Sequence, residues 1–481
     1  MIVLIGVFAA TTATALATTV SWGTAIQVPG TAAPSGLNVG GAAYVNSVSC
    51  ARAGKCAAGG SYRDNSGYQA FVVGETSSGW RNALEVPGTA APTGLNVGGA
   101  AEVTSISCTS AGNCAAGGGY TDGSGAKQAF VVDATNGHWG NAAEVQLAGL
   151  NVAGNAEVNS ISCTSAGNCA AGGYYSDNGK SGLHPGSKQA FVVDEHNGHW
   201  GTAIPVPGLK NLNAGDLAFV RSISCGSAGY CSAGGEYSDT VGGGTSQAFV
   251  VSETPGGGWG SPITVHGTPP LSLGGHATVT AVSCTGAAAC TASGEYRAAG
   301  NVVQSFVVSR MWAWGQALRL MSGAGGPSNF NSASEASAVS ISCSAPGSCV
   351  TGGSYQPTGS SAAHAFVAES FSGTWTYPVR LWGVAAASNG SQMTSVSCAD
   401  PGDCVAGGIY YDASHEAHPF LAPERGGNWY AATQVPGVLA LGSVIVDRGV
   451  FVSCAVNAGT CGIGGSYQDG AGKAQAFVTN P

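Results

Sequence analysis

The sequence predicts an all-β protein, a single eight-bladed β-propeller with four antiparallel strands in each blade. Three observations support this fold. A unit of about 58 residues recurs eight times, which is within the range of periods that mark propellers and solenoids. Each unit contains four short segments of strand length between turn residues. The two ends of the chain carry complementary parts of one unit, which a closed ring requires.

The repeat is defined by its cysteines and tryptophans. Seven units carry a C-x5-C pair and the last carries C-x6-C, at Cys50/Cys56, Cys108/Cys114, Cys163/Cys169, Cys225/Cys231, Cys284/Cys290, Cys343/Cys349, Cys398/Cys404 and Cys454/Cys461. One tryptophan recurs in register with them, at Trp22, Trp80, Trp139, Trp200, Trp259, Trp314, Trp375 and Trp429.

The third unit shows the four expected strands. They are 158–163 (VNSISC), 169–175 (CAAGGYY), 189–195 (QAFVVDE) and 200–206 (WGTAIPV). Each is rich in β-branched or aromatic residues and is bounded by Gly, Asn, Asp or Pro. The glycine pair Gly172-Gly173 in the second strand suits close packing of neighbouring sheets, where a side chain would not fit.

The chain ends predict how the ring closes. The last unit stops after its third strand, at AQAFVTNP, whereas the chain begins with the missing piece, VSWGTAIQVPG. We therefore expect the N-terminal segment to supply the outer strand of the last blade and to protect its open edge. The propeller then spans 18–481, and a pair of smaller propellers is the main rival.

These motifs carry a resemblance. The phrases QAFVV…GxW and VxSISC…CxAGG look like the short-repeat propellers of secreted bacterial proteins. They resemble the extracellular family named for its His-Ala-Phe tripeptide, which stands here at His364-Ala365-Phe366 and as Gln-Ala-Phe elsewhere. There is a weaker similarity to Asp-box, sialidase-type repeats. The resemblance covers nearly the whole mature chain and implies a propeller, but such rings host binding, scaffolding and hydrolytic roles alike.

Three roles compete for the sixteen cysteines. Zinc favours C-x2-4-C pairs completed by further ligands, and the nine histidines do not follow the pairs. Redox catalysis favours C-x-x-C and does not require eight copies of a cysteine pair. Disulfides need only that the two sulfurs meet, and a hairpin with a five-residue turn places the cysteines opposite each other, at the end of the first strand and the start of the second. We predict eight local disulfides, each worth about 2 kcal/mol in the chain-entropy model.

Export agrees with this chemistry. Residues 1–17 are apolar and end in Ala15-Leu16-Ala17, which resembles a signal peptide, although no basic residue precedes the apolar run; a buried first strand is the alternative. No segment is suited to spanning a membrane. Charged residues make up only 9% of the chain, with a net charge of -9 and no basic stripe, which argues against nucleic-acid binding. We expect a secreted protein, extracellular or at the cell surface.

An acidic residue follows the second strand in six units, at Asp64, Asp122, Asp177, Asp239, Asp412 and Asp469. The simplest interpretation is an Asx-turn that orders the hairpin between the second and third strands. The alternative is a calcium or glycan contact on one rim, although one carboxylate per turn is few for calcium. We expect no cofactor and assign no metal ligand.

The recurring tryptophans open the outer strand, where packing between blades explains them best. Irregular aromatic residues, namely Trp312, Trp382 and Tyr377, are better candidates for stacking on sugars. The long loops between blades, such as 29–43, share one face with the acidic turns. That face is the expected binding surface, because loops on a rigid scaffold carry function.

No catalytic motif is recognisable, and no catalytic residue is assigned. Two carboxylates, Glu102 and Glu157, occupy equivalent places in adjacent first strands, where Tyr44, Phe219 and Thr278 stand elsewhere. We predict a secreted, non-catalytic binding or scaffold protein that recognises extracellular polysaccharide or protein. The alternatives are a glycan-cleaving hydrolase or lyase, and a structural envelope or matrix protein.

Overall fold

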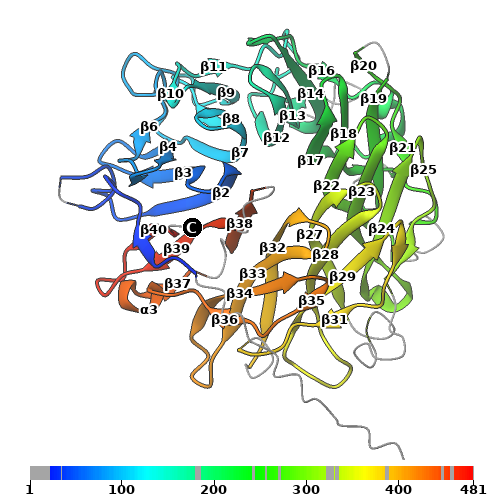
Figure 1. Ribbon diagram of the computed structural model, residues 1–481. Helices are drawn as coiled ribbons and strands as arrows, with labels where there is room; N and C mark the ends of the chain where they lie inside the picture. Colours follow the sequence, from blue (N-terminus) through cyan, green and yellow to red (C-terminus); the bar gives the residue numbers. More distant parts are fainter. Residues whose placement is uncertain are drawn as a thin grey trace, which may run out of the picture.

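Eight blades surround a central axis in the computed structural model, and the chain passes through them in sequence order (Figure 1). The structure describes residues 22–33, 35–178, 186–240, 244–254, 257–268, 272, 274–320, 330, 335–384, 389–445, 449–455 and 460–479. The expected signal segment, 1–17, lies outside them. The eight-bladed fold predicted from the repeat is confirmed.

The strands fall into four positions in each blade, numbered here from the axis outward. The innermost strands are β2 (Ala43–Arg52), β7 (Glu102–Ser110), β12 (Glu157–Ser165), β17 (Ala218–Ser227), β22 (Ala277–Gly286), β27 (Ala336–Ala345), β32 (Ser391–Asp400) and β38 (Val450–Cys454). The second strands are β3 (Lys55–Arg63), β8 (Asn113–Thr121), β13 (Asn168–Asp177), β18 (Tyr230–Ser238), β23 (Ala289–Arg297), β28 (Ser348–Tyr355), β33 (Asp403–Tyr411) and β39 (Cys461–Gln468).

The third strands are β4 (Tyr68–Thr76), β9 (Lys127–Thr135), β14 (Ser187–His196), β19 (Ser246–Thr254), β24 (Val303–Met311), β29 (His364–Phe371), β34 (Ala417–Arg425) and β40 (Ala474–Thr479). Three short helices, α1 (Leu209–Leu212), η1 (Ala299–Asn301) and α3 (Val438–Leu441), lie in connecting loops, and β37 (Ser443–Val444) is an extra strand of the eighth blade that pairs with β39.

The outer position differs from the expected continuous strand. In blades 1 to 7 it consists of two pieces, and both pair with the third strand. The first pieces are β5 (Gly79–Trp80), β10 (His138–Trp139), β15 (His199–Trp200), β20 (Gly258–Trp259), β25 (Ala313–Trp314), β30 (Thr374–Trp375) and β35 (Asn428–Trp429). The second pieces are β6 (Leu84–Glu85), β11 (Ala143–Glu144), β16 (Ile204–Pro205), β21 (Ile263–Thr264), β26 (Leu318–Arg319), β31 (Val379–Arg380) and β36 (Thr433–Gln434).

The break has a physical cause. Between the two pieces, the backbone turns toward the preceding blade: Ala142 N–H donates to the Pro87 carbonyl at 2.7 Å, and Ala203 N–H donates to the Gln146 carbonyl at 2.9 Å. Six interfaces carry such a bond. At the other two the residue is Pro262 or Pro378, which has no N–H to donate. In five of the seven split strands the middle therefore links adjacent blades, and in the other two a proline interrupts the strand.

The ring closes as expected from the chain ends. Strand β1 (Ala25–Gln27) pairs antiparallel with β40, with Ile26 opposite Val478, and so completes the eighth blade. The blue N-terminal strands and the red C-terminal strands lie side by side in Figure 1. This pairing protects the edge that β40 would otherwise expose.

Each cysteine pair forms a disulfide within one blade, and no cysteine is free. The eight bonds are Cys50–Cys56, Cys108–Cys114, Cys163–Cys169, Cys225–Cys231, Cys284–Cys290, Cys343–Cys349, Cys398–Cys404 and Cys454–Cys461.

The expected five-residue turn between the cysteines is wrong. Cys163 lies directly opposite Cys169 in the register of β12 and β13, but the strands continue past them to Ser165 and Asn168. A bulge follows Cys163, and only residues 166–167 turn the chain. The disulfides therefore cross the hairpins inside the paired strands.

The expected position of the second cysteine is wrong at Cys231 and Cys290. Each was expected to begin its strand beside an open turn, but each is the second residue of its strand, in β18 and β23. Cys231 is 5% exposed and Cys290 3%. Cys231 N–H donates to the Glu253 carboxylate at 2.6 Å, and Cys290 Sγ contacts Ser232 Oγ of the preceding blade at 3.3 Å. Both cysteines are therefore buried structural residues of the blade interfaces.

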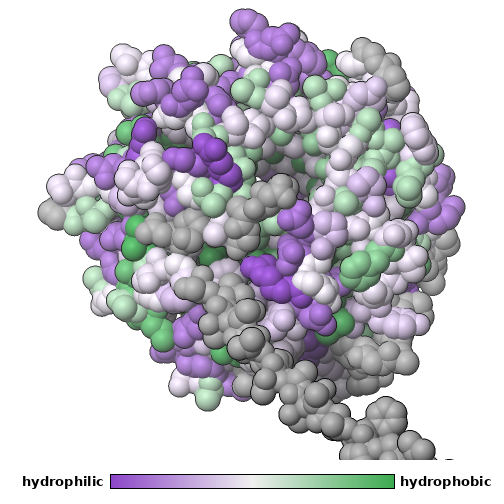
Figure 2. Space-filling view, viewed as in Figure 1, coloured by the Kyte–Doolittle hydropathy of each residue, from purple (hydrophilic) through white to green (hydrophobic). Residues whose placement is uncertain are grey.

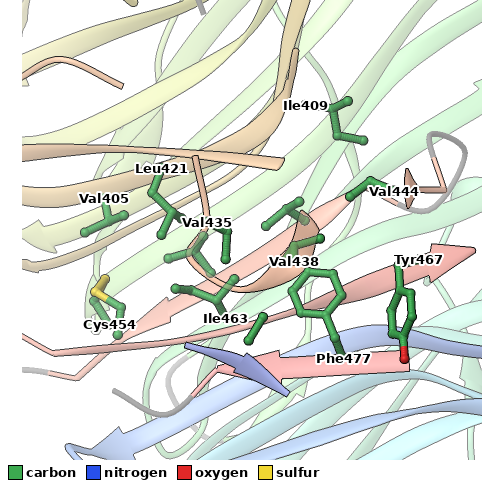
Figure 3. Close-up of a cluster of buried hydrophobic side chains, with 14 of the residues drawn as sticks. Val405, Ile409, Leu421, Val435, Val438, Val444, Cys454, Ile463, Tyr467 and Phe477 are labelled. Carbon is green, nitrogen blue, oxygen red and sulfur yellow. A yellow bond between two sulfur atoms is a disulfide. The ribbon is translucent and has the colours of Figure 1, made fainter. Parts of the chain in front are cut away.

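The hydrophobic core lies between blades rather than at the axis. Each third strand contributes a fully buried phenylalanine, at Phe71, Phe130, Phe191, Phe249, Phe306, Phe366, Phe420 and Phe477. Figure 3 shows the cluster between the last two blades, where Val405 and Leu421 of blade 7 meet Ile463 and Phe477 of blade 8. Neighbouring blades therefore share their apolar surface pairwise.

A ring of serine hydroxyls joins the innermost strands. Ser105 Oγ accepts from Ile161 N–H at 3.1 Å, and Ser107 Oγ accepts from Cys163 N–H at 3.0 Å. Equivalent bonds cross all eight interfaces, including the closing one, where Ser453 Oγ accepts from Cys50 N–H at 2.9 Å. They satisfy backbone donors that an edge strand would leave unpaired. The recurring Ser-x-Ser-Cys phrase therefore has a structural role.

Two further features let the inner strands approach closely. The innermost strand bulges in blades 1 to 7, and several bulged side chains donate to the next blade; Asn159 Nδ2, for example, bonds the Val220 carbonyl at 2.7 Å. The expected close packing at the glycine pair is confirmed at Gly172. A Cβ there would lie 2.6 Å from Val220 Cγ1 of the next blade, which is closer than real Cβ atoms approach.

The serine ring can be tested at one position. We expect Ser107→Ala to destabilise the protein by about 1 kcal/mol, because it leaves the Cys163 N–H without its acceptor. The urea midpoint and amide exchange of β12 measure the effect. Ser77→Ala is the matched control, since Ser77 is exposed on the turn before β5. Equal midpoints in both variants would contradict the structural role.

The disulfides are tested by counting thiols. In the denatured, unreduced protein we expect no reactive thiol, and after reduction all sixteen. Ellman titration gives both numbers. Reduction also restores chain entropy to the unfolded state, so the reduced protein should melt at a lower temperature. Sixteen free thiols before reduction would overturn the disulfide assignment.

Candidate functional site

The propeller has two faces. The turns between second and third strands and the loops between blades form the loop face. The turns next to the disulfides, together with the turns between third and outer strands, form the disulfide face. The sequence placed the six acidic candidates on the loop face, and the ends of β3, β8, β13, β18, β33 and β39 carry them there.

Their carboxylates bond within or beside their own hairpins. Asp122 accepts from Ser124 N–H at 2.8 Å and Ala126 N–H at 3.0 Å, as in the expected Asx-turn. Hydrogen bonds from the Ser124 hydroxyl and the Gln128 amide lower the pKa of Asp122 to about 2. Asp64, Asp412 and Asp469 also accept turn N–H groups, Asp239 bonds Thr245 and Gln247, and Asp177 pairs with Lys210.

Further hydrogen bonds beside these turns attach the long loops between blades to the preceding blade. Gln128 Nε2 donates to Asp122, and Gln128 Oε1 accepts from Asn151 Nδ2 at 2.8 Å. Asn38, Asn96 and Asn213 make the equivalent bond to Gln475, Gln69 and Gln189. These hydrogen bonds order the loop face.

The paired carboxylates of the enzyme hypothesis bond to separate partners. Glu157 forms an ion pair with Lys127 at 2.7 Å, and Glu102 accepts from Asn46 at 3.3 Å. Among the described residues, one group of acids and histidine has metal-ligand proximity, Asp412, Glu416 and His418; there His418 lies 3.0 Å from Asp412, whose carboxylate also orders its turn.

The loop face has an open hollow between blades 4 and 5, with a volume of about 410 Å³. Several of its polar side chains already have partners: His276 contacts the Ser246 hydroxyl within the hollow, and Glu236 pairs with Arg221, which lies outside its lining. The face of the ring shown in Figure 2 mixes small hydrophilic and hydrophobic areas, as expected for a chain with few charges.

The irregular aromatic candidates are on the surface. Trp312 is 86% exposed, Tyr377 54% and Trp382 52%. Trp312 lies in the turn between β24 and β25 on the disulfide face, whereas Trp382 follows β31 in a loop between blades. The three belong to different turns and line none of the cavities described below.

The recurring tryptophans bond across blade interfaces on the disulfide face. For four of them the partner is the side chain three places after the buried phenylalanine of the preceding blade, whereas Trp80 Nε1 donates to the Thr479 carbonyl at 3.1 Å. Trp200 Nε1 donates to Asp133 at 2.9 Å, and Trp259 Nε1 donates to Asp194 at 3.0 Å. Trp314 bonds Ser252, and Trp429 bonds Glu369. The expected packing role thus includes a specific hydrogen bond.

A second acid often lies beside this bond, on the third strand of the following blade. Glu195 faces Asp133, and Glu424 faces Glu369. Burial raises the pKa of Glu195 to about 7, and the Asp133 carboxylate adds to the rise. Burial likewise raises the pKa of Glu424 to about 8, helped by Glu369 and Asp403. At each of these interfaces two carboxylates are buried close to each other.

The interface between blades 1 and 2 departs from this pattern. Gly74 stands where Asp133 or Glu369 stands elsewhere, and Ala134 stands where Glu195 or Glu424 does. A cavity of about 260 Å³, here the blade 1–2 cavity, opens in their place between β3, β4 and β6 of blade 1 and β8, β9 and β10 of blade 2. The corresponding cavities at interfaces 2–3, 5–6 and 6–7 hold about 110, 20 and 10 Å³.

The walls of the blade 1–2 cavity combine an aromatic ring, aliphatic side chains and two cations. Trp139 forms one wall, and its indole N–H has no hydrogen-bond partner in the described part of the chain. Val72 and Leu84 line the blade 1 side, together with Lys55 and Arg81. Cys114 is partly exposed here, whereas the second cysteine of every other pair, Cys231 and Cys290 included, is buried.

Sequence reasoning missed this cavity because it treated the repeats as equivalent. It directed the search to the loop face, whereas the cavity lies on the disulfide face. The signal was present: FVVG in blade 1 and FVVDA in blade 2 replace the acids found in other units. An alignment of the eight units by their phenylalanines would have shown both replacements.

No described helix has the length and apolar character needed to cross a membrane. No family model matches the chain, and no curated protein matches it, so the resemblance to the His-Ala-Phe repeat family stays a prediction.

The chain is similar to several solved propellers. The BP39L lectin from Burkholderia pseudomallei shares 15% identity at a TM-score of 0.44, covering 82% of this chain and 99% of the lectin. The propeller domain of the Trilobed protease from Pyrococcus furiosus shares 8% at 0.41, covering 82% and 97%. The Hadza microbial sialidase Hz136 shares 11% at 0.36, covering 73% of each chain. TM-scores this low say nothing about what this chain binds.

The buried acid pairs predict a pH dependence of stability. The raised pKa of Glu424 means that the folded state binds this proton more tightly than the unfolded chain, whose glutamates titrate near 4.5. The contribution of Glu424 to stability is therefore greatest below about pH 4.5 and is lost as the pH rises toward about 8. Glu424→Gln should flatten this fall and raise the melting temperature at about pH 8.

Thermal melts across this range measure the effect. The matched control is Glu416→Gln, because Glu416 is exposed on the turn before β34 of the same blade. A wild-type melting temperature that is the same at both ends of the range would contradict the assignment.

Proposed function

We propose that this chain is a secreted, non-catalytic binding protein that holds an extracellular polysaccharide. The observation that carries the proposal is the blade 1–2 cavity. Its volume of about 260 Å³ equals roughly nine water molecules at about 30 Å³ each, the space that one sugar ring fills. A concave site with an apolar wall and a few polar groups is the usual form of a small-ligand pocket.

The walls suit a sugar. Trp139 and Leu84 offer apolar surface on which the C–H groups of a sugar ring can pack, and the indole N–H offers a hydrogen bond. Asn82 and Asn136 lie at the edge with polar amides. One ring would enter the cavity while the rest of the polysaccharide remains outside.

Secretion is supported by the eight disulfides. Such bonds persist in oxidising surroundings and are rare in the cytosol. We place the protein outside the cell or at its surface, after removal of a leader within 1–17.

Binding to immobilised polysaccharides tests the proposal. We expect the protein to be retained by at least one member of a broad panel and Trp139→Ala to lose at least tenfold in affinity, because it removes the aromatic wall. Trp312→Ala is the matched control: it removes an exposed tryptophan from the same face, outside the cavity. Circular dichroism melts establish that both variants fold.

The rival functions give different results on the same panel. Release of new reducing ends would favour a hydrolase, and release of unsaturated sugars would favour a lyase. Concentration-dependent self-association in sedimentation, without retention by any glycan, would favour a structural matrix protein. Loss of retention in Trp312→Ala alone would place the site at the exposed tryptophan instead.

A further inference from the structure

We propose that the blade 1–2 cavity recognises a carboxylate, which takes the place of the acidic side chains that interfaces 2–3, 3–4 and 6–7 supply from within the protein. The inference rests on the proposed function in its choice of ligand, the acidic sugar of a polysaccharide. It adds the chemical group that the site selects.

The equivalent tryptophans of other blades show which groups can bond to the Trp139 indole. Trp139 lies opposite Ala134 in register, as Trp200 lies opposite Glu195 and Trp429 opposite Glu424. Trp200 and Trp259 both donate their indole N–H to an aspartate of the preceding blade. At Trp139 the equivalent residue is Gly74, which has no side chain. A ligand carboxylate about 2.9 Å from Trp139 Nε1 would reproduce the bond made elsewhere.

The cavity also carries two cations, Lys55 and Arg81, that the other interfaces lack at the same positions. Lys55 occupies a position held elsewhere by Asn113, Asn168, Tyr230, Ala289, Ser348, Asp403 and Thr460. Arg81 follows Trp80, where the other units have Gly23, Gly140, Gly201, Gly260, Gly315, Thr376 and Tyr430. Both cations therefore belong to this one interface. The chain has only 16 lysines and arginines in 481 residues, which makes their coincidence informative.

One acid, Glu75, lines the cavity beside these cations, and the charge of Lys55 acts on its carboxylate. Within the described ranges, neither Lys55 nor Arg81 forms an ion pair, and the one hydrogen bond of the Arg81 guanidinium is a contact of 3.5 Å to the Gly137 carbonyl across the cavity. Glu75, the nearest acid in sequence, accepts from Cys56 N–H of its own blade. Compared with interfaces 2–3, 3–4 and 6–7, two acids are absent, and the cavity is lined by two cations and one acid. The excess of positive charge favours an anion.

Gly74 is not required by the backbone. Its φ lies outside the left-handed region, and a Cβ built there would meet no atom within 4 Å. By contrast, a Cβ at Gly172 would collide with the next blade. Since the fold would accept a side chain at position 74, the absence of one leaves space for a ligand.

Isothermal titration calorimetry with glucuronate and glucose tests the inference. The two share a ring and differ in the carboxylate, so the wild type should bind glucuronate at least tenfold more tightly. Gly74→Asp should abolish this preference, because its own carboxylate would reach Trp139 and the cations. Gly286→Asp is the matched control: it adds the same charge to the same face in blade 5, at another glycine with no atom within 4 Å.

Two conservative variants keep the test decisive if Gly74→Asp folds poorly. Lys55→Asn introduces the residue of blades 2 and 3, and Trp139→Phe keeps the ring but removes the N–H. Each should weaken glucuronate at least threefold and leave glucose unchanged. Equal affinity for glucose and glucuronate, or full glucuronate binding by Gly74→Asp, would overturn the carboxylate inference.

The two proposals fail in different ways. If glucose and neutral glycans bind in the cavity as well as acidic ones, the protein binds glycans but the carboxylate inference is wrong. If glucuronate binds but oligouronides and polysaccharides do not, the carboxylate inference stands and the polysaccharide function is wrong. In that case the ligand is a free organic acid.

Discussion

The hydrogen bonds between serine hydroxyls and the backbone of the next blade are the interaction on which the structure depends. An innermost strand has a free edge, and its N–H groups need acceptors; Ser105 and Ser107 supply them for β12. The outer strands add a second belt through Ala142 and Ala203. Because each blade is held at both its inner and outer ends, a missing side chain between blades leaves a space that the ring does not close.

That rigidity explains how a repeat acquires one special site. Seven interfaces can fill the space between third strands and tryptophan with acids, hydroxyls or other side chains, and the blade 1–2 interface does not. Four departures, at Lys55, Gly74, Arg81 and Ala134, surround the same cavity although they come from separate strands and turns. Two remove volume and negative charge, and two add positive charge. At the other interfaces, side chains of the protein itself occupy the position that we assign to the ligand.

Much of the fold could be predicted because it depends on local patterns. The alternating strands, the repeat period, the cysteine pairs and the complementary chain ends all lie in the sequence, and β1 pairs with β40 as they imply. Details that depend on neighbouring blades were wrong. The outer strand is split where Ala142 and its equivalents bond another blade or where a proline interrupts it, and the turn after Cys163 is short because a bulge and Gly167 tighten it. Cys231 and Cys290 are buried within their strands because adjacent blades cover them.

The sequence by itself determined the eight blades, their closure and the disulfide partners, since each follows from residues a few positions apart or from the phase of the repeat. Only the tertiary structure decided where a ligand has room. Gly74 and Trp139 are 65 positions apart and look unremarkable singly. Their relation arises because blade packing sets the outer tryptophan of one unit against the third strand of the unit before it. An alignment of the units shows the replacements, but only the packing of the blades shows that they meet at one cavity.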